Sequence, residues 1–560
     1  MDLAVLSMIT FLGAKLTFRT MGVFLTAISF FATIFASAAS IPTIKKTEGG
    51  GYLVVDGKPY LILGGELGNS SAGTSAQADT ILPRLAKLHL NTILMPVAWE
   101  QIEPVEGEFD FSILDHWVDI AREQNLRLVL LWFGSWKNSV SSYAPVWVKE
   151  NTRRFPRAMS ADGTELDILS PLSSESLEAD KRAFSKLMAH IREKDAGRQT
   201  VLMVQVENEV GYLGRGRDRS PVANRLFRED VPTALLNSLR DNQSLLSPEL
   251  ASHFRPAGKT WSEVFGDAAD EVFMAWNYAS YIQAVATEGK RAYALPMYVN
   301  AQLPAPFERA GEYPSGGPHP YYLAVYRAAA PALDFFSPDI YWPNFEYWAQ
   351  RYRFQWNPLF VPEARLESAP FNALYAYGEA KAFGFSPFGI DDVGAKSAQS
   401  ENELAISETY KALEGLSDIL APAQLAGKTR GLVLHSDSPR PAQTVALGGY
   451  LFEAALLRSW PAKTLLVDDG AMLIVQVSAN EFFITGRGLT VAFFRDPDSD
   501  DRTAGISSIE EVSRVDGQWV IQRRLNGDQS GQGRALSMAA NQMHTYRVTL
   551  YSTERAQQIR

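Results

Sequence analysis

The chain has 560 residues, of which 46% are hydrophobic and 11% aromatic, and its formal net charge is −10. This length suffices for two or three domains with large cores, and the acidic balance argues against nucleic acid or an anionic membrane surface as a partner. Cysteine is absent, which excludes disulfides, thiolate metal sites and cysteine nucleophiles.

The first forty residues have the pattern of a secretory signal. Lys15 and Arg19 precede an apolar stretch at residues 23–35, and Ala36 and Ala38 follow at the −3 and −1 positions of a signal-peptidase site. We predict that residues 1–38 are a signal peptide and that the mature protein is secreted or periplasmic, with no membrane attachment after cleavage. A retained membrane anchor is the alternative, although a span needs roughly 20 apolar residues.

From Ile41 onward, short apolar runs alternate with amphipathic segments. Each run is typical of a buried parallel strand and is followed by polar or aromatic residues. The eight predicted strands are Tyr60–Gly64, Thr92–Val97, Arg127–Trp132, Val201–Val206, Pro296–Val299, Asp334–Ile340, Leu359–Val361 and Ala382–Ser386. The predicted helices include Ala78–Leu90, Ser112–Gln124, Leu177–Lys194 and Tyr278–Arg291.

This alternation predicts an α/β fold, a (β/α)8 TIM barrel over residues 41–423, with its active site at the carboxyl ends of the strands. A doubly wound open sheet is the alternative, because the long polar stretch from Arg215 to Asp267 can hide or add an element. The basic residues of Gly214–Arg219 (GRGRDR) are interpreted as a solvated loop.

After residue 423 the pattern changes to short strand-like runs separated by Gly, Asp, Asn and Ser. We predict an all-β, sandwich-like domain over residues 424–560. Such a domain can bind sugar or simply pack against the barrel, and the sequence favours packing.

Two glutamates follow predicted strands that lie far apart in the chain. Val201–Gly211 (VLMVQVENEVG) delivers Glu209 after the fourth strand, and Pro358–Arg365 (PLFVPEAR) delivers Glu363 after the seventh. One carboxylic acid and one carboxylate that meet at the rim of a barrel are the minimal equipment for retaining hydrolysis of a glycosidic bond. We therefore predict that Glu209 and Glu363 are catalytic.

Further residues at strand ends are candidates for sugar binding. Asn208 is placed to hydrogen-bond the sugar 2-hydroxyl, and aromatic rings at strand ends can stack on pyranose faces. The predicted substrate-binding residues are Asn208, Glu66, Glu100, Asn300, Trp99, Trp132, Trp136, Tyr341 and Trp342. The seven histidines show no metal-binding spacing and no glycine-rich phosphate loop occurs, so we predict no metal and no cofactor.

Three motifs resemble glycoside hydrolase family 35, the retaining β-galactosidases of clan A. They are PVAWE at Pro96–Glu100, EPVEGEFDF at Glu103–Phe111 and VQVENEVG at Val204–Gly211, where the family pattern ENEYG becomes ENEVG. The resemblance implies that Glu209 is the acid/base and Glu363 the nucleophile. Where the family has Asn-Ala-Glu after the third strand, this chain has Trp132–Trp136 (WFGSW), and Pro96 replaces a common tyrosine.

The resemblance suggests a divergent bacterial branch with a β-rich C-terminal extension, associated with removal of galactose from plant oligosaccharides. The implied function is a secreted, retaining exo-β-galactosidase whose partner is a carbohydrate. Two alternatives are another clan A retaining glycosidase, such as an endo-β-glycanase, and a carbohydrate-binding protein without catalytic activity. The sequence does not determine linkage, aglycone or oligomeric state.

Overall fold

The computed structural model describes residues 41–47, 50–354, 356–395, 401–438, 442–498 and 502–554. The predicted signal peptide lies outside these residues, so its cleavage and the secreted location stay predictions. None of the described helices combines the length and apolarity that a membrane crossing requires.

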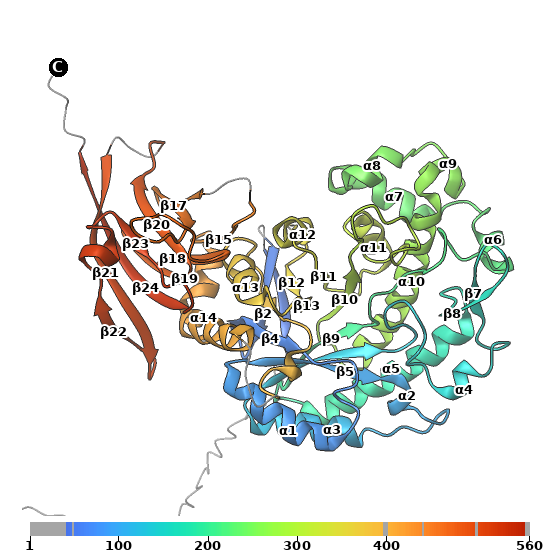
Figure 1. The fold of residues 1–560 in the computed structure, drawn as a ribbon. Helices are drawn as coiled ribbons and strands as arrows, with labels where there is room; N and C mark the ends of the chain where they lie inside the picture. Colours follow the sequence, from blue (N-terminus) through green and yellow to red (C-terminus); the bar gives the residue numbers. More distant parts are fainter. Residues whose placement is uncertain are drawn as a thin grey trace, which may run out of the picture. The chain divides into compact units, whose positions relative to one another are not determined.

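A ring of parallel strands forms the first part of the described chain (Figure 1). Its strands, in spatial order, are β4 (Ile62–Glu66), β5 (Thr92–Ala98), β6 (Arg127–Phe133), β9 (Val201–Val206), β10 (Met297–Gln302), β11 (Phe335–Ile340), β13 (Glu363–Ala364), β12 (Phe360–Val361) and β14 (Gly384–Phe385).

One strand of the ring is divided at Pro362. Before the proline, β12 pairs with β14, and after it β13 pairs with β11. Proline has no amide hydrogen to donate to the ladder, which accounts for the interruption. Since β14 also pairs with β4, β12 and β13 together close the sheet into a barrel of eight strands, as predicted.

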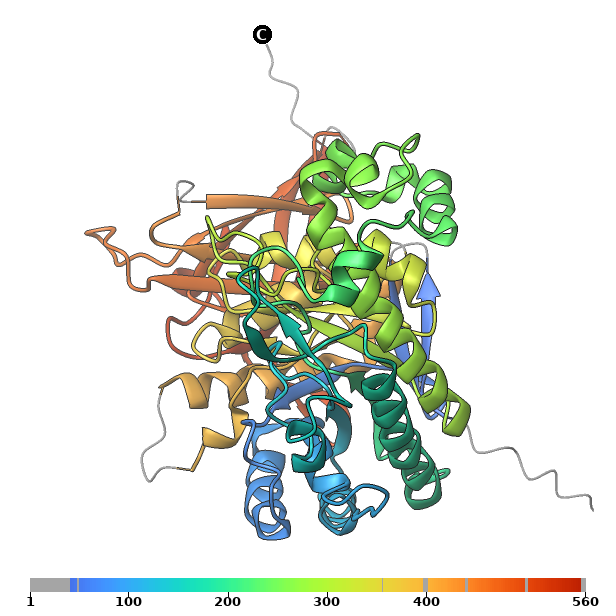
Figure 2. The same cartoon turned by 90° about the vertical axis from the view of Figure 1, so that its right-hand side faces the viewer.

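Helices follow the strands in chain order. In Figures 1 and 2, α1, α3, α5 and α10 lie one after another along the outside of the barrel. The helices of the barrel are α1 (Ser75–Leu85), α2 (Trp99–Ile102), α3 (Ser112–Glu123), α4 (Val146–Lys149), α5 (Ser174–Asp195), α6 (Pro221–Leu226), α7 (Thr233–Asp241), α8 (Pro248–His253), α9 (Trp261–Phe265), α10 (Ala269–Ala292), α11 (Leu323–Ala329), α12 (Phe345–Tyr352) and α13 (Ala369–Gly378). Four of them, α6 to α9, lie in the polar stretch that the sequence left unassigned.

The barrel interior is apolar at one end and polar at the other. A cluster of buried residues that includes Leu131, Phe335 and Phe360 fills the interior below the strand ends. Further along the same strands the inward residues become polar, with Ser337 and Asp339 following Phe335 at every second position of β11. The apolar cluster inside the barrel therefore lies directly below a layer of buried polar residues at the carboxyl ends of the strands.

The chain outside the ring forms small hairpins and two larger antiparallel sheets. A three-stranded sheet contains β1 (Thr43–Thr47), β2 (Gly50–Val55) and β3 (Lys58–Tyr60), and a hairpin contains β7 (Arg157–Met159) and β8 (Glu165–Leu169). After α14 (Glu401–Leu425), six strands pair in the order β15 (Thr429–His435), β18 (Asp469–Gln476), β19 (Glu481–Arg487), β24 (His544–Glu554), β21 (Arg502–Val515) and β22 (Gln518–Arg524). The other four are β16 (Ala442–Leu447), β17 (Tyr450–Leu456), β20 (Leu489–Arg495) and β23 (Ala535–Ser537).

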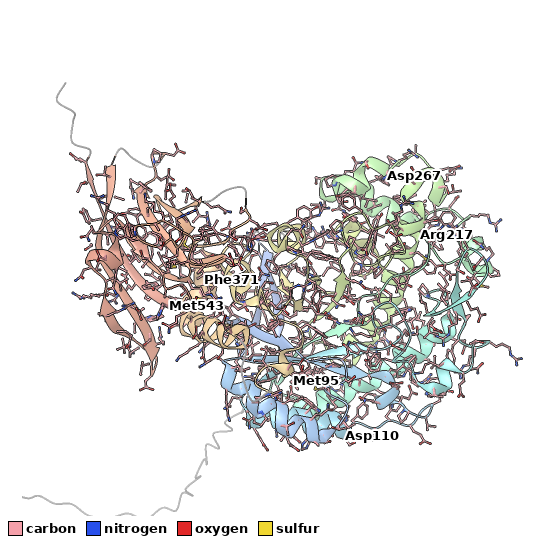
Figure 3. The ribbon with its side chains drawn as sticks, viewed as in Figure 1. Met95, Asp110, Arg217, Asp267, Phe371 and Met543 are labelled. Carbon is pink, nitrogen blue, oxygen red and sulfur yellow. The ribbon has the colours of Figure 1, made fainter. Side chains whose placement is uncertain are left out.

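Both faces of β18, in the six-stranded sheet, are buried. On β18, Met472 and Ile474 pack in a cluster with residues of the four-stranded sheet, whereas Leu473 and Val475 belong to the same cluster as the barrel helices. Phe371 of α13, labelled in Figure 3, lies 4.5 Å beneath the guanidinium of Arg487 on β19. The predicted fold class, a TIM barrel followed by an all-β region, is confirmed; the boundary at residue 423 stays a prediction.

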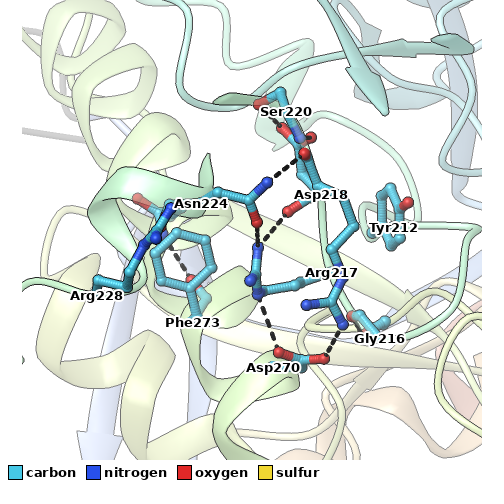
Figure 4. A network of polar contacts seen from close by, with 12 residues as sticks. Tyr212, Gly216, Arg217, Asp218, Ser220, Asn224, Arg228, Asp270 and Phe273 are labelled. Atoms are coloured by element: carbon cyan, nitrogen blue, oxygen red, sulfur yellow. Dashed lines mark hydrogen bonds and ion pairs between the residues drawn. The ribbon is translucent and has the colours of Figure 1, made fainter. Parts of the chain in front are cut away.

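The GRGRDR segment is not the solvated loop that the sequence suggested. Arg217 is only 5% exposed and Asp218 is fully buried. The Arg217 Nε donates to Asp270 Oδ1 of α10 at 3.0 Å, and Arg219 donates to the other oxygen of Asp270 (Figure 4). Arg217 also donates to Asn224 of α6 at 2.9 Å, so the segment joins two helices through a partly buried ionic network.

Candidate active site

Glu209 lies immediately beyond β9, where the backbone departs from strand geometry. Glu207 and Glu209 have φ values of +64° and +46°, a region that non-glycine residues rarely adopt. Glu207 turns outward and accepts a hydrogen bond from the Trp136 amide at 2.8 Å. The Glu209 amide donates to Asn300 Oδ1 at 2.9 Å, and its Oε2 accepts from Asn138 Nδ2 at 2.6 Å.

Glu363 begins β13, directly after Pro362. The Tyr341 hydroxyl donates to Glu363 Oε2 at 2.7 Å. The amides of Asn208 and Asn300 approach Oε1 at 3.5 and 3.4 Å. One carboxylate oxygen is therefore fixed by a tyrosine, while the other is oriented by two longer amide contacts.

The two glutamates meet in space although 154 positions separate them (363 − 209). Oxygen atoms of Glu209, Asp339 and Glu363 all lie within 4.8 Å of one another. Retaining glycosidases hold their carboxyl groups about 5–5.5 Å apart, whereas inverting enzymes leave room for water at about 6.5–9.5 Å. The arrangement fits direct attack on the anomeric carbon followed by hydrolysis.

The electrostatics of the pair favour one proton on Glu209. Burial, and then the negative charge of Glu363, raises the pKa of Glu209 to about 7, against opposing effects of Lys137 and of a hydrogen bond with Asp339. A carboxyl group that keeps its proton near neutral pH can protonate a leaving oxygen. The raised pKa of Glu209 agrees with the acid/base role that the resemblance to family 35 implied.

The predicted binding residues Asn208, Asn300 and Glu66 lie beside this pair. All three are fully buried, and both Glu66 oxygens receive no hydrogen bond from any described residue. Burial, followed by the charge of Glu363, raises the pKa of Glu66 well above its usual range. Their contacts with a sugar stay predictions.

The prediction that aromatic rings stack on the sugar is wrong for three tryptophans, because their rings are fully buried in the protein. Trp132 donates to Asp180 of α5 at 3.0 Å and packs on Phe184. Trp136 donates to the Leu169 carbonyl at 3.0 Å and packs against Tyr278 and Tyr281. Trp99 donates to Glu103 at 2.9 Å and packs against Trp147. These indoles point into the layer between the strands and the helices, where a sugar has no access.

Two of the remaining candidates, Trp342 and Glu100, line clefts near the strand ends, and the third, Tyr341, contacts the catalytic candidate Glu363. Trp342 lines a cleft of about 310 Å³ between the loops that follow β10 and β11, together with other aromatic residues. Glu100 lines a cleft of about 380 Å³ formed by the loops after β4 and β5, and it is paired with Lys149 at 2.9 Å. Tyr341, next to Trp342, contacts Glu363 itself.

Sequence reasoning missed Asp339, Lys137 and Asn138. Asp339 is 2% exposed and Lys137 3% exposed, although charged residues are seldom buried. Period-two alternation from Phe335 through Ser337 would have directed Asp339 inward. Lys137 and Asn138 lie in a loop after β6, and no local pattern indicates that this loop turns toward Glu209.

Glu209, Asp339 and Glu363 bring carboxylate oxygens together, but three carboxylates alone do not define a metal site, and we assign none. The prediction that the protein needs no metal and no cofactor stays a prediction.

Two parts of the chain match known protein-family models. Residues 71–235 match the glycoside hydrolase family 42 model, described as "Beta-galactosidase". Residues 406–537 match a domain of unknown function, DUF5597. The first match contains Glu209 but ends before Glu363. Over residues 71–235 the chain is therefore similar to glycoside hydrolases of the β-galactosidase class.

A curated relative points the same way. A "Beta-galactosidase" of Xanthomonas manihotis is 30% identical over 189 residues, which are 31% of this chain and 28% of that protein. The match thus spans less than a third of either sequence. Family 42 is the family found by these comparisons, and family 35 membership is not shown.

Solved structures of several glycosidases are similar at a lower level. A β-galactosidase from Rahnella sp. R3 has a TM-score of 0.45 and 15% identity, covering 68% of this chain and 58% of that one. An endo-1,4-β-mannanase from Rhizomucor miehei has a TM-score of 0.43 and 12% identity, covering 67% and 99%. A β-galactosidase from the psychrophilic Marinomonas ef1 has a TM-score of 0.43 and 12% identity, covering 63% and 60%. With every TM-score below 0.5, these likenesses support no functional argument.

Proposed function

We propose that this protein is a retaining exo-β-galactosidase that removes terminal β-D-galactosyl residues from oligosaccharides. The observation that carries the proposal is the meeting of the Glu209 and Glu363 carboxyl oxygens within 4.8 Å at the carboxyl ends of the barrel strands. The match of residues 71–235 to a β-galactosidase family supports galactose as the sugar.

In the first step, the Glu363 carboxylate attacks the anomeric carbon while Glu209 gives its proton to the leaving oxygen. The bond between the anomeric carbon and the leaving oxygen breaks, and a covalent galactosyl ester forms on Glu363. Tyr341 holds Oε2 of Glu363 by a hydrogen bond, which leaves Oε1 as the attacking atom.

In the second step, Glu209 acts as a base. Esterification removes the charge of Glu363, which is one of the causes that raise the Glu209 pKa, so the pKa of Glu209 falls. Glu209 then takes a proton from water, and the resulting hydroxide equivalent displaces Glu363 from the sugar. Two inversions give net retention of configuration.

The test is a panel of nitrophenyl β-galactoside, nitrophenyl β-glucoside and a polymeric β-glucan, with the first-formed anomer identified by NMR. We expect turnover of the galactoside and release of the β-anomer. Rapid cleavage of the polymer would favour an endo-β-glycanase, and binding without turnover would favour a carbohydrate-binding protein. Release of the α-anomer would contradict the double displacement.

Two variants assign the roles. Glu209→Gln should lower kcat/KM by about 10²–10⁴ for poor leaving groups and much less for nitrophenyl leaving groups, which need little protonation. Glu363→Gln should abolish turnover of both kinds of substrate while retaining sugar binding. Equal losses on both substrates for Glu209→Gln would contradict its role as the acid.

Two further proposals rest on sequence. The motif at Val204–Gly211 supports membership of family 35, which is a different family from the family 42 that residues 71–235 match. The pattern of residues 1–38 supports export to the periplasm or medium. N-terminal sequencing of the mature protein should then begin at Ala39, and a mature chain that retains residues 1–38 would contradict export by cleavage.

A further inference from the structure

A buried acid with no positive partner lies beneath the catalytic pair. Asp339 points inward from β11 and is 2% exposed, and no positively charged described residue is among the main influences on its charge. Its Oδ2 accepts a hydrogen bond from Asn300 Nδ2 at 2.7 Å. Its Oδ1 is buried and receives no hydrogen bond from the described residues. An ionised carboxylate would leave this oxygen without a donor.

The surroundings of Asp339 disfavour a negative charge. Burial comes first, and the charges of Glu363, Glu209 and Glu66 add to it, so the pKa of Asp339 is raised well above its usual range. The other titratable groups that face these carboxyls are Lys137 from the loop after β6, Tyr298 of β10, Tyr341 after β11 and Tyr352 of α12. Lys137 lowers the pKa values of Glu209 and Glu66.

Asn300 sets the orientation of Asp339 relative to Glu209. The same side chain donates to Asp339 Oδ2 through Nδ2 and accepts the Glu209 amide through Oδ1. With Oδ2 used as an acceptor, Oδ1 is the atom that can carry a proton. Oxygen atoms of Asp339 and Glu209 lie within 4.8 Å of one another, and a hydrogen bond between these two side chains contributes to the pKa shifts of both, so a protonated Asp339 has the Glu209 carboxylate beside it as an acceptor.

We propose that Asp339 is a positioning residue which stays a neutral acid and donates a hydrogen bond from Oδ1 to the Glu209 carboxylate. This inference rests on the proposed function of Glu209 as the acid/base. The proton remains on Asp339 throughout, so the group stabilises the ionised form of Glu209 without taking part in proton transfer. Glu209 thereby loses its proton more readily in the first step and persists as a base in the second.

The test compares Asp339→Asn with Asp339→Ala. Asparagine copies a neutral acid, since its carbonyl accepts from Asn300 and its NH₂ donates to Glu209. The readout is the basic limb of kcat/KM against pH, which reports loss of the Glu209 proton in the free enzyme. We expect the limb to stay in place in Asp339→Asn and to rise by about 1 pH unit in Asp339→Ala, because one hydrogen bond to the carboxylate is lost.

A charged Asp339 predicts the opposite sign. Both substitutions would then remove a neighbouring negative charge, and the limb would fall in both variants. A purely structural role predicts equal loss of activity in both variants with no movement of the limb. Either result overturns the inference, and so does stabilisation of the wild type by Ca²⁺ or Mg²⁺ that Asp339→Asn abolishes, because a metal ligand would be ionised.

A second readout separates this inference from the proposed function. Infrared difference spectra of the wild type at pH 8 should show the carbonyl band of a protonated carboxyl group that Asp339→Asn removes. If the wild type fails to hydrolyse any aryl glycoside yet the band is lost in the variant, the proposed function fails and the neutral Asp339 stands. If the wild type is active and the band is unchanged in the variant, the neutral Asp339 fails.

Discussion

Lys137 is the positive charge that bears most directly on the proposed acid. It is 3% exposed, lies 5.0 Å above the ring centroid of Phe133, and its charge lowers the pKa values of Glu209 and Glu66. Burial, the charge of Glu363 and the opposing charge of Lys137 together therefore set the pH at which Glu209 loses its proton. The positions of Glu363 and Lys137 in the sequence do not reveal how their charges act together on the pKa of Glu209.

Lys137→Met should move the basic limb of the pH profile upward. The free enzyme needs a protonated Glu209, whose pKa is about 7, so activity falls as pH rises through that value. Without the positive charge the proton is held more tightly, and the limb shifts to higher pH. The measurement is kcat/KM against pH, with the partly exposed Lys149→Met as the control. A downward shift would show that another group is the acid.

The buried tryptophans separate packing from sugar binding. Trp132→Phe removes the donor to Asp180, which is fully buried and keeps hydrogen bonds from Ser135 and Tyr281. We expect the free energy of unfolding to fall by about 1–3 kcal/mol with little change in KM. Urea unfolding and steady-state kinetics measure both, and Trp460→Phe, at an 87% exposed position, is the control. A large rise in KM with unchanged stability would restore the stacking role.

At the scale of elements, the sequence indicated the barrel well. The apolar runs that became β5, β6 and β9 are long and end in polar residues, so strand positions and the places of Glu209 and Glu363 followed from local pattern. The prediction of sugar stacking failed for Trp132 because a side chain near a strand end can face either the cleft or the helices, and Trp132 faces the helices. The loops remained undetermined, because pairings such as Arg217 with Asp270 depend on long-range contacts.

The network shown in Figure 4 should stabilise the loop after β9. Asp270 accepts from both Arg217 and Arg219, so Asp270→Asn leaves two guanidinium groups without their carboxylate, and that of Arg217 is buried. We expect the free energy of unfolding to fall by roughly 3 kcal/mol, as for other partly buried ion pairs that lose one member. Arg154→Met, which breaks a surface pair with Glu106, should cost at most about 1 kcal/mol. Equal costs for the two variants would mean that burial adds nothing to the network.

At the scale of the whole molecule, the buried carboxyls make stability depend on pH. Burial raises the pKa values of Glu66, Glu207, Glu209 and Asp339 in the folded state, whereas an unfolded glutamate titrates near 4.5. Between about pH 4.5 and 7 the folded state thus binds more protons, so the free energy of unfolding contributed by these groups falls as pH rises. Urea unfolding at pH 5.5 and pH 8 should show this fall, and Glu209→Gln should reduce it. An unchanged slope in the variant would mean that Glu209 titrates normally.

The barrel and the β-region should unfold together. Leu473 and Val475 of β18 share a core with the barrel helices, so separating the two parts would expose apolar surface on both. Calorimetry of the protein should give one thermal unfolding transition, and two well-separated transitions would contradict a shared core. The interpretation of the C-terminal region as packing against the barrel leads to the same expectation.

The division of one strand at Pro362 has a consequence for inactivation by heat. Before Pro362 the strand pairs with β14, and after it the strand pairs with β11, so the pairing partner changes across a single residue. Local opening of a closed sheet should begin where its backbone hydrogen bonds are fewest, and Glu363 is the next residue. Slow warming should therefore abolish turnover while far-ultraviolet circular dichroism still reports a nearly intact barrel.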